Sequence, residues 1–222
     1  MKIVQISEPM TLVGGADVSA ALFQMAFTRA PRLVAADGGA DRALACGAVP
    51  EAVIGDCDSI STAARAALPA ERLYEVSEQD STDFEKCLAR IDAPLILGVG
   101  FSGARLDHQL AVCNALTRAP DQRCVLLGSD DLVFLAPASM LLDLPEGCRV
   151  SLFPMGAVEG HSEGLKWPIR GLNFAPDGQI GTSNMATGPV QLSVTAPKLL
   201  VIVPLAQLDA VIDGLRQAKA GW

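Results

Sequence analysis

Histidine is scarce in this 222-residue chain, which contains only His108 and His161. A zinc site built mainly from histidine is therefore excluded, and a hydrolase with a Ser-His-Asp triad would have to use one of these two imidazoles. We expect His108 to lie on a solvated helix face without a catalytic role. Paired cysteines are missing as well, because the six cysteines are scattered and form no C-x-x-C motif. Reduced, mostly buried thiols are expected.

Basic residues are outnumbered by acidic ones, with 17 Lys and Arg against 25 Asp and Glu. The formal net charge is −8 and the sequence pI is about 4.7. Nucleic acids and anionic membranes bind surfaces with clustered Lys and Arg, so neither is expected as a partner. An anionic substrate would need a local source of positive charge.

Long apolar runs are also absent, although half of the residues are hydrophobic and the mean hydropathy is +0.33. The run from Leu199 to Val203 stops at Pro204, so we expect no membrane-spanning segment. Gln5, Glu8 and Pro9 interrupt any signal-peptide core, and we therefore expect a cytoplasmic protein. No internal repeat occurs, and the length suffices for one large domain or two smaller ones.

Strand-like and helix-like segments alternate through the first 130 residues. This alternation predicts an α/β domain over residues 1–130, with a Rossmann-like parallel sheet and right-handed crossovers. The predicted strands are Lys2–Ile6, Met10–Val13, Leu33–Ala36, Ala52–Ile54, Leu73–Val76, Leu95–Leu97 and Cys124–Leu127.

The pattern changes from about residue 131, where short apolar runs are separated by Pro, Gly and Asp turns. It predicts an antiparallel β-sandwich domain over residues 131–222. A final amphipathic helix is expected, because apolar residues recur there at helical spacing: Leu208, Val211, Ile212 and Leu215. The predicted strands are Leu132–Ala136, Met140–Leu144, Arg149–Phe153, Gln191–Val194 and Leu199–Val203.

Carboxylates gather in loops that follow two predicted strands. Asp56 and Asp58 follow Ala52–Ile54, and Asp83 comes after Leu73–Val76. The carboxyl ends of parallel strands form the ligand edge of such a sheet, and alternate side chains of an extended segment point the same way. Like charges this close repel unless a cation joins them. Oxygen ligands without His or paired Cys favour Mg²⁺ with a bound phosphate, so we predict a metal site here.

The same loops also have a structural explanation. Asp58 and Ser59 could begin the helix expected near residues 61–68. Thr82 with Glu85 fits a capping box for the helix that follows. Either cluster alone is explained at least as well in this way, whereas two clusters at successive strand ends favour a functional site.

Glycines follow two further predicted strands. In Asp37–Asp41 they allow a ligand to approach the backbone at the start of a helix. The Gly98-Gly100-Gly103 loop has the spacing G-x-G-x-x-G, which leaves an NAD(P)-dependent oxidoreductase as an alternative. This motif comes late in the α/β segment, and Asp107 would lie close to a cofactor pyrophosphate. Arg105 with Asp107 suits a metal-bound polyphosphate better.

Six segments of the chain, in this order, resemble the thiamine pyrophosphokinase family. Any one of them is a weak signal, but six in family order are specific and span nearly the whole chain. The resemblance implies an α/β nucleotide-binding domain followed by a β-sandwich, in a homodimer that binds thiamine between its subunits. The six segments are Asp37–Asp41, Gly55–Ser59, Gln79–Lys86, Gly103–His108, Gly164–Trp167 and Thr182–Asn184.

The activity implied by the resemblance is the Mg²⁺-dependent transfer of a pyrophosphoryl group from ATP to the hydroxyethyl oxygen of thiamine, releasing AMP. The implied catalytic residues are Asp56, Asp58, Asp83, Lys86, Arg105 and Asp107, of which Asp56, Asp58 and Asp83 bind the metal. The implied ATP-binding residues are Asp37, Gly38, Gly39, Asp80, Thr82, Gly103, Arg105 and Asn114. The implied thiamine-binding residues are Gln79, Trp167, Ser183 and Asn184. No residue is identified as a general base.

The chain departs from the family pattern at two positions. Glu78 stands where the family usually has Asp, and Gly181 stands where it has Ser. Besides the pyrophosphokinase, two other classes remain open: the NAD(P)-linked oxidoreductase and a non-catalytic nucleotide-binding module.

Overall fold

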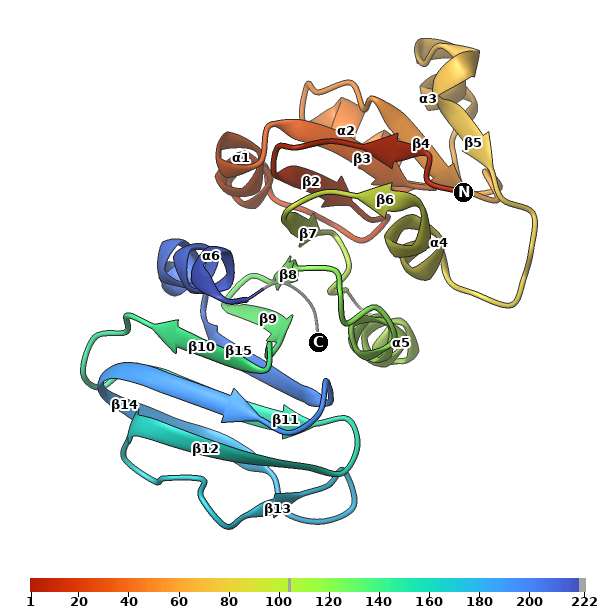
Figure 1. Ribbon diagram of the computed structural model, residues 1–222. Coiled ribbons are helices and arrows are strands. Elements are labelled where there is room, and N and C mark those ends of the chain that lie inside the picture. Colours follow the sequence, from red (N-terminus) through yellow and green to blue (C-terminus); the bar gives the residue numbers. More distant parts are fainter. Residues whose placement is uncertain (104, 220–222) are drawn as a thin grey trace. The chain divides into compact units, whose positions relative to one another are not determined.

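Two units divide the chain in the computed structural model, which describes residues 1–103 and 105–219 (Figure 1). Unit 1 contains residues 1–115 and 124–128, and unit 2 contains residues 116–123 and the chain from Ser129 onward. The first unit is mixed α/β and the second is rich in antiparallel strands, which confirms the coarse fold class expected from the sequence.

Unit 1 is built on parallel strands. β2 pairs with β7, β7 with β8, β3 with β4, and β4 with β5, while β1 and β6 form a separate parallel pair. β2 also lies beside β3. Every residue of β2, β4, β7 and β8 is buried, as expected for parallel strands covered on both faces. The strands are β1 (Val4–Gln5), β2 (Met10–Val13), β3 (Arg32–Ala36), β4 (Ala52–Gly55), β5 (Leu73–Glu75), β6 (Ile91–Asp92), β7 (Ile96–Val99) and β8 (Cys124–Leu127).

The helices between these strands begin at side-chain caps that the sequence supplies. Ser19 accepts a hydrogen bond at the start of α1, and Ser61 does so at the start of α3. Thr82 and Glu85 form the predicted capping box of α4, which confirms that prediction. The helices and short 3-10 turn are α1 (Ala20–Arg29), α2 (Gly39–Ala45), α3 (Thr62–Ala67), η1 (Ala70–Arg72), α4 (Asp83–Arg90) and α5 (Leu106–Arg118).

The cap of α3 settles one sequence-based alternative. Ser61 is the N-cap, so the suggestion that Asp58 and Ser59 begin this helix is wrong. The two residues lie in the loop before the helix, and α3 does not need their side chains as caps.

The carboxyl ends of neighbouring strands meet at one edge of unit 1. The Gly14 amide donates to the Val99 carbonyl oxygen (2.8 Å), which joins the ends of β2 and β7. The Asp37 amide donates to the Ile54 carbonyl oxygen (3.1 Å), which joins the ends of β3 and β4. The loops that leave these strands therefore start close together, as a parallel sheet requires.

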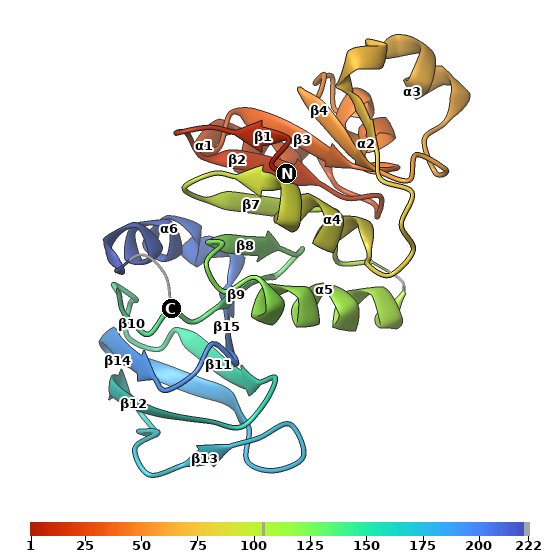
Figure 2. The same cartoon turned by 45° about the vertical axis from the view of Figure 1, so that its right-hand side comes forward.

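Unit 2 has antiparallel strand pairs throughout its described residues. The order is β9-β15-β11-β14-β12-β13, with β10 also paired to β14 (Figure 2). The strands are β9 (Asp131–Leu135), β10 (Ser139–Leu142), β11 (Arg149–Pro154), β12 (Val158–Leu165), β13 (Asn173–Phe174), β14 (Gly181–Val194) and β15 (Leu199–Pro204).

One of these strands was not predicted from the sequence, and another is longer than predicted. β12 is not among the predicted strands, and β14 begins ten residues before the predicted Gln191–Val194. The added segments contain many exposed polar residues and no apolar run, so hydrophobic periodicity gives no signal for them. Pairing with β11, β10 and β12 holds β14 in place instead.

The predicted C-terminal amphipathic helix is confirmed as α6 (Leu208–Gln217), which follows the 3-10 turn η2 (Leu205–Gln207). The four apolar residues predicted to face the core, Leu208, Val211, Ile212 and Leu215, are buried. None of the helices in the described part of the chain is long and apolar enough to cross a membrane.

Candidate active site

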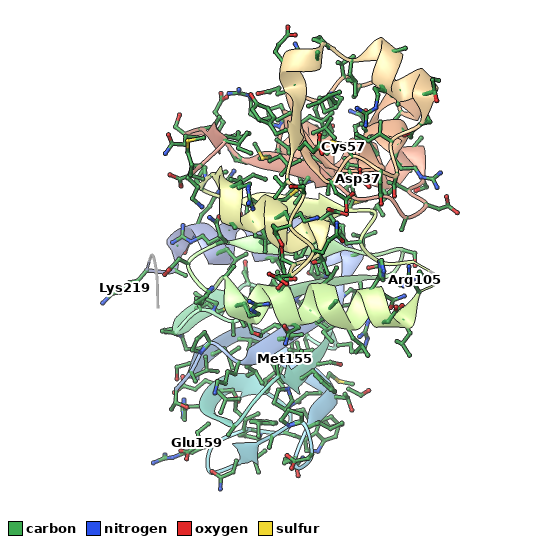
Figure 3. All side chains as sticks on the ribbon, turned by 90° about the vertical axis from the view of Figure 1, so that its right-hand side faces the viewer. Asp37, Cys57, Arg105, Met155, Glu159 and Lys219 are labelled. Carbon is green, nitrogen blue, oxygen red and sulfur yellow. The ribbon has the colours of Figure 1, made fainter. Side chains whose placement is uncertain are left out.

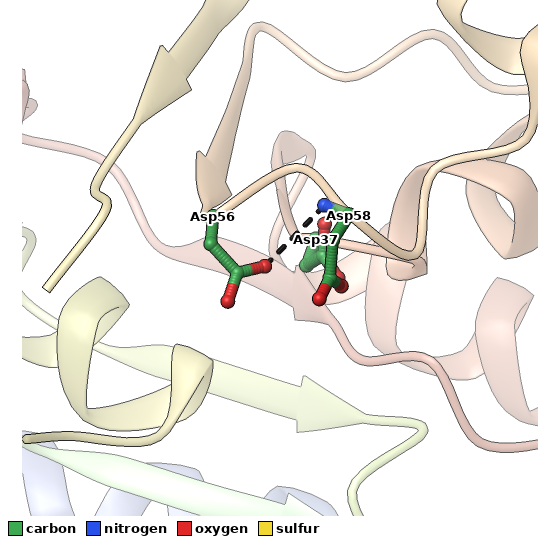
Figure 4. Close-up of side chains that lie close together, drawn as sticks. All are labelled: Asp37, Asp56 and Asp58. Carbon is green, nitrogen blue, oxygen red and sulfur yellow. Dashed lines mark hydrogen bonds between the residues drawn. The ribbon is translucent and has the colours of Figure 1, made fainter. Parts of the chain in front are cut away.

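Three carboxylates converge at the strand ends of unit 1 (Figure 4). Asp37 follows β3, while Asp56 and Asp58 lie in the loop after β4. Each offers one oxygen atom, and these oxygens all lie within 4.8 Å of one another. We call these three residues the acidic cluster.

A sharp turn rather than an extended segment brings Asp56 and Asp58 together. Cys57, between them, has φ of 64°, so the expected alternation along an extended chain is wrong as the explanation. The Asp58 amide donates to Asp56 Oδ1 (3.3 Å), which closes the turn. Asp37 also has a positive φ, 44°. Such backbone costs roughly 1–3 kcal/mol per non-glycine residue and is concentrated at functional sites.

Cys57 is buried in this turn beside Asp37 (Figure 3). Burial raises the pKa of its thiol, and the negative charge of Asp37 raises it further. The thiol is therefore protonated and a poor nucleophile, as the neighbouring carboxylates predict.

One side-chain oxygen of Asp37 is buried without a hydrogen-bond partner among the described residues. The side chain is buried, its Oδ2 accepts from the Ser59 amide (3.2 Å), and its Oδ1 has no hydrogen-bond partner among the described residues. Burial raises the pKa of Asp37, and the charges of Asp83 and Asp56 raise it further, although the hydrogen bonds from Ser59 oppose this. A hard divalent cation fits this donor set, because it would bind the free oxygen and offset the repulsion.

Lys86 supplies a buried positive charge beside the acidic cluster. Its side chain is only 2% exposed, and Nζ lies 3.1 Å from Asp83 Oδ1 and 3.7 Å from Asp56 Oδ2. Burial alone would lower the pKa of Lys86, but the hydrogen bond to Asp83 and the charges of Asp83, Asp56 and Glu78 raise it above the ordinary value. The lysine is therefore a fixed cation next to the carboxylates.

Asp83, predicted as a metal ligand together with Asp56 and Asp58, is not one of the three carboxylates that converge, and it is linked to them through Lys86 and through close packing. It is the first residue of α4, and its Oδ1 would lie 3.2 Å from a Cβ added at Gly55. The same Cβ would lie 2.7 Å from Asp37 Cβ, so only glycine lets Asp37 and Asp83 approach from two sides. Hydrophobic periodicity marks Gly55 merely as the end of a strand, and its packing role is visible only in three dimensions.

Gln79 lies beside the acidic cluster, although the resemblance implies a thiamine contact for it. Its Nε2 donates to Asp56 Oδ2 (3.3 Å). The amide of Asp58 and the side chain of Gln79 stabilise the charged form of Asp56 and lower its pKa. Asp56 and Asp37 thus have pKa values shifted in opposite directions within one cluster.

The other predicted nucleotide-binding residues lie on loops and helices of unit 1. Gly38 and Gly39 start α2, and Thr82 caps α4, so Thr82 has a structural role in the free protein. Asp80 is exposed, and its amide donates to Glu78 Oε2 (2.9 Å). Gly103 lies in the loop before α5.

Arg105 and Asp107 stand at the start of α5 and bind each other. Arg105 Nη2 donates to Asp107 Oδ2 (2.7 Å), and both side chains are 67% exposed. Arg105 hydrogen bonds lower the pKa of Asp107, and the carboxylate in turn raises the pKa of Arg105. His108 and Asn114 lie on the same helix and are exposed, as expected for His108. Ala104, part of the predicted Gly103–His108 segment, lies outside the described residues.

Packing accounts for all three glycines of the Gly98-Gly100-Gly103 loop, and a Cβ at Gly103 would lie 2.8 Å from Ala16 Cβ. Gly100 has φ of 75°, and a Cβ there would lie 2.5 Å from the Gly14 carbonyl oxygen. A Cβ at Gly98 would lie 3.0 Å from a side-chain carbon of Leu126 and 3.3 Å from one of Phe101. Contacts within unit 1 therefore account for these glycines without a dinucleotide.

A second group of predicted residues lies in unit 2, around Trp167. The Trp167 side chain is 53% exposed, and Lys166 Nζ lies 4.8 Å from its ring centroid. Ser183 and Asn184 stand near the start of β14. We call Trp167, Ser183 and Asn184, together with Ser151, the Trp167 corner.

Ser151 belongs to this corner although no sequence signal singles it out. The residue is buried on β11, and its Oγ accepts from the Ser183 amide (3.0 Å). Ser183 has φ of 61°, and the β11–β14 register shifts next to it, between Val150 and Leu152. The bond from Ser151 therefore satisfies an amide that the irregular strand leaves without a regular ladder partner.

Packing accounts for the departure at Gly181. A Cβ there would lie 3.1 Å from Leu152 Cβ and 3.2 Å from Phe174 Cε1. A serine would force one of these buried side chains to shift, so glycine suits the core of this unit.

Comparisons with known proteins point to one family. The family model "Thiamin pyrophosphokinase, catalytic domain" matches residues 23–127. The model "Thiamin pyrophosphokinase, vitamin B1 binding domain" matches residues 140–199. Together the two models match most of the chain.

Relatives with assigned names are similar over part of their length. Thiamine pyrophosphokinase 1 of Oryza sativa subsp. japonica is 32% identical over 155 residues, which cover 61% of this chain and 59% of that protein. Thiamine pyrophosphokinase 1 of Arabidopsis thaliana is 31% identical over 155 residues, 61% of this chain and 58% of that protein. The match thus spans less than two thirds of either relative. Neither these relatives nor the family models support the oxidoreductase alternative.

Solved structures share the fold at low identity. The thiamin pyrophosphokinase from Geobacillus thermodenitrificans has a TM-score of 0.73 and 22% identity, covering 88% of this chain and 96% of that one. The yeast thiamin pyrophosphokinase has a TM-score of 0.71 and 19% identity, covering 94% of this chain and 90% of that one. At these identities the likeness concerns the fold alone.

Proposed function

We propose that this chain, which belongs to the thiamin pyrophosphokinase family, transfers a pyrophosphoryl group from ATP to thiamine. The observation that carries the proposal is the acidic cluster beside buried Lys86, at the strand ends of the unit that the catalytic-domain model matches. Three converging carboxylates, one of which has a buried oxygen without a hydrogen-bond partner among the described residues, suit a divalent cation, and a fixed ammonium suits phosphate oxygens.

The proposed reaction forms one bond and breaks one. The hydroxyethyl oxygen of thiamine bonds to the β-phosphorus of ATP, while the bond from that phosphorus to the α–β bridging oxygen breaks. The bridging oxygen leaves with AMP, and the hydroxyl proton passes to solvent or to a base that remains unassigned. Thiamine diphosphate is the second product. Such transfers depend on positioning and charge neutralisation more than on covalent chemistry by the protein.

Each residue of the site has a proposed task. Asp56, Asp58 and Asp83 hold Mg²⁺, with Asp37 and Asp80 in or next to its coordination shell. When bound, the ion would neutralise phosphate oxygens and orient the polyphosphate. Lys86 and Arg105 donate to phosphate oxygens.

The remaining nucleotide-binding residues are proposed to position ATP. They are Gly38, Gly39, Thr82, Gly103, Asp107 and Asn114. Arg105 and Asp107 bind each other in the free protein, so ATP would compete with this exposed ion pair. Breaking it costs little, because both side chains are exposed and solvent screens the pair.

The acceptor side is proposed to involve Gln79, Trp167 and Ser183. An aromatic face suits a cationic heteroaromatic ring, and Trp167 exposes such a face. We further propose a homodimer that binds thiamine between subunits, a Rossmann-like catalytic domain over residues 1–130, and a β-sandwich domain over residues 131–222.

A product assay tests the proposal. The purified protein is incubated with ATP, Mg²⁺ and thiamine, and AMP and thiamine diphosphate are quantified. Equimolar AMP and thiamine diphosphate that require all three components would support the proposed activity. ADP as coproduct would indicate ordinary kinase chemistry, and ATP binding without turnover would favour a non-catalytic nucleotide-binding module.

A further inference from the structure

The Asn184 side chain is directed at the backbone of Trp167, and this defines its contribution to the Trp167 corner. It is 7% exposed and lies on β14, seventeen positions away in sequence. Its Oδ1 accepts from the Trp167 amide (3.2 Å), and its Nδ2 donates to the Trp167 carbonyl oxygen (2.7 Å). Both main-chain polar groups of one residue are therefore bound by one side chain.

This side chain extends the strand ladder by one residue. Leu165 pairs with Ala186, and the Lys166 amide donates to the Met185 carbonyl oxygen (2.8 Å). At the next position the side-chain amide of Asn184 replaces the main chain of β14 as partner of Trp167. A primary amide offers the same donor and acceptor as a peptide group, so it can serve in this way.

Few hydrogen-bonding positions remain on Asn184 for a ligand. Oδ1 accepts a second hydrogen bond from the Met185 amide (2.8 Å), which occupies both of its lone pairs. Nδ2 has one further hydrogen beyond the bond to Trp167. An almost fully buried amide with three hydrogen bonds is better suited to support a neighbour than to bind a substrate directly.

Trp167 is the neighbour that gains from this support. Its indole is half exposed, and Pro168 after it lacks the amide needed to continue a ladder. A large exposed side chain pays an ordering cost when a ligand immobilises it, unless its backbone is already fixed. The bonds from Asn184 fix that backbone in advance.

We propose that Asn184 is a positioning residue that holds the Trp167 indole as a preformed platform for the flat, cationic ring of the acceptor substrate. This inference rests on the proposed function and assigns Asn184 a role through Trp167 in place of direct contact with thiamine. Ser183, which is exposed and held by Ser151, remains available for the direct contact.

The test compares Asn184→Ala with a matched control, Thr195→Val. Thr195 binds the main chain of one residue in the same manner, since its Oγ1 accepts from the Glu159 amide (3.0 Å) and donates to the Glu159 carbonyl oxygen (3.2 Å). Both variants are made in a Trp222→Phe background, which leaves Trp167 as the only tryptophan. Steady-state kinetics, fluorescence anisotropy and acrylamide quenching are measured.

We expect Asn184→Ala to raise KM for thiamine about 3- to 10-fold, the cost of immobilising a side chain on binding. KM for ATP should stay within about twofold, because only a general folding defect would change both constants. Trp167 anisotropy should fall and quenching should rise. Thr195→Val should leave all these values as in the parent. Asn184→Ser, which keeps a hydroxyl donor and acceptor on a shorter side chain, should give intermediate values and serves if Asn184→Ala fails to fold.

Other outcomes would overturn the inference. An unchanged Trp167 signal with a raised thiamine KM would make Asn184 a direct substrate contact. Unchanged KM and unchanged fluorescence would make it structural only. Trp167→Ala separates this inference from the proposed function: if it leaves thiamine KM unchanged in an active enzyme, the platform is wrong while the pyrophosphokinase proposal stands. If no variant, the parent included, forms AMP, the function itself is wrong.

Discussion

In the acidic cluster a buried oxygen of Asp37 has no hydrogen-bond partner among the described residues, whereas in the Trp167 corner the buried amide of Asn184 makes three hydrogen bonds. The first region therefore carries an electrostatic cost that a bound cation can relieve. The second is already satisfied and offers a ligand a preformed surface. Ligand binding should thus be coupled to stability much more strongly in unit 1 than in unit 2.

The two regions share one feature, which is strained backbone. The positive-φ residues other than glycine in the described chain are Asp37, Cys57 and Ser183. Two of them shape the acidic cluster and one shapes the Trp167 corner. Because such backbone is costly, its restriction to these two regions of the described chain supports a functional role for both.

The largest expected effect concerns turnover. Asp56→Asn and Asp83→Asn should each lower kcat at least about 100-fold, because the amide keeps the size of the side chain and removes the charge that we propose holds the metal. Circular dichroism should show that both variants remain folded. Asp177→Asn, at an exposed position of unit 2, is the control and should retain full activity. Wild-type rates in both Asp56→Asn and Asp83→Asn would mean that the metal site lies elsewhere.

Removing Lys86 should produce the largest loss of stability. Lys86→Met keeps the length of the stem but leaves Asp56 and Asp83 without their shared cation, so the free energy of unfolding should fall by about 2–4 kcal/mol. Urea denaturation in EDTA measures the loss, and Lys198→Met, at an exposed lysine, is the control. An unfolding midpoint equal to that of the control would show that the lysine is not needed to balance the carboxylates.

Asp37→Asn should separate stability from metal binding. Without Mg²⁺ the neutral amide should be tolerated or raise Tm by about 2–4 °C, because burial and neighbouring charge already disfavour the ionised carboxyl. Saturating Mg²⁺ at about 100 Kd should stabilise the wild type by about 2.7 kcal/mol and the variant far less. Calorimetry with and without Mg²⁺ gives both numbers. An equal Mg²⁺ shift in the two proteins would exclude Asp37 from the site.

Relieving the backbone strain should have a smaller effect on stability, and its effect on activity should differ between the acidic cluster and the Trp167 corner. Ser183→Gly should stabilise the protein by up to about 1 kcal/mol, since glycine adopts positive φ freely, whereas Cys57→Gly gains the same relief but also loses a buried side chain from the core and should stabilise less. Ser183→Gly should also raise KM for thiamine, whereas Cys57→Gly should affect Mg²⁺ dependence instead. Thermal unfolding and steady-state kinetics test both. Destabilisation by both glycines would show that the side chains, and not the strain, dominate at these positions.

The smallest effect is expected for an ion pair outside both regions. It shows how much a partly exposed salt bridge contributes to the stability of this chain. Arg32 Nε donates to Glu51 Oε1 (2.6 Å), and this bond lowers the pKa of Glu51. A depressed folded-state pKa contributes stability above the unfolded-state value of 4.5, and that contribution is lost as the pH falls through the folded-state value. Both side chains are more than one third exposed, so Glu51→Gln should cost less than about 1 kcal/mol at pH 7 and almost nothing at pH 2.

The sequence predicted more of the acidic cluster than of the Trp167 corner. Asp56 and Asp58 stand out because charged residues directly after a buried strand break its apolar pattern, and the structure does bring them together. Asp37 was predicted as an ATP-binding residue, and its membership of the cluster depends on the β3–β4 pairing. The link from Asn184 to Trp167 spans seventeen residues and has no periodic signal.

Local patterns in the sequence were enough to determine the capping box at Thr82, the apolar stripe of α6, the alternation of strands and helices in unit 1, and the family resemblance that the comparisons confirm. Each cap, apolar stripe, strand or motif among these features is a pattern within a short segment of the chain. Only the tertiary structure decided that Lys86 is buried between two carboxylates, that Gly55 lets Asp37 and Asp83 approach, and that Asn184 supports Trp167. Each of these depends on which strands pair and on the burial that follows, and burial is a property of the folded chain rather than of any segment.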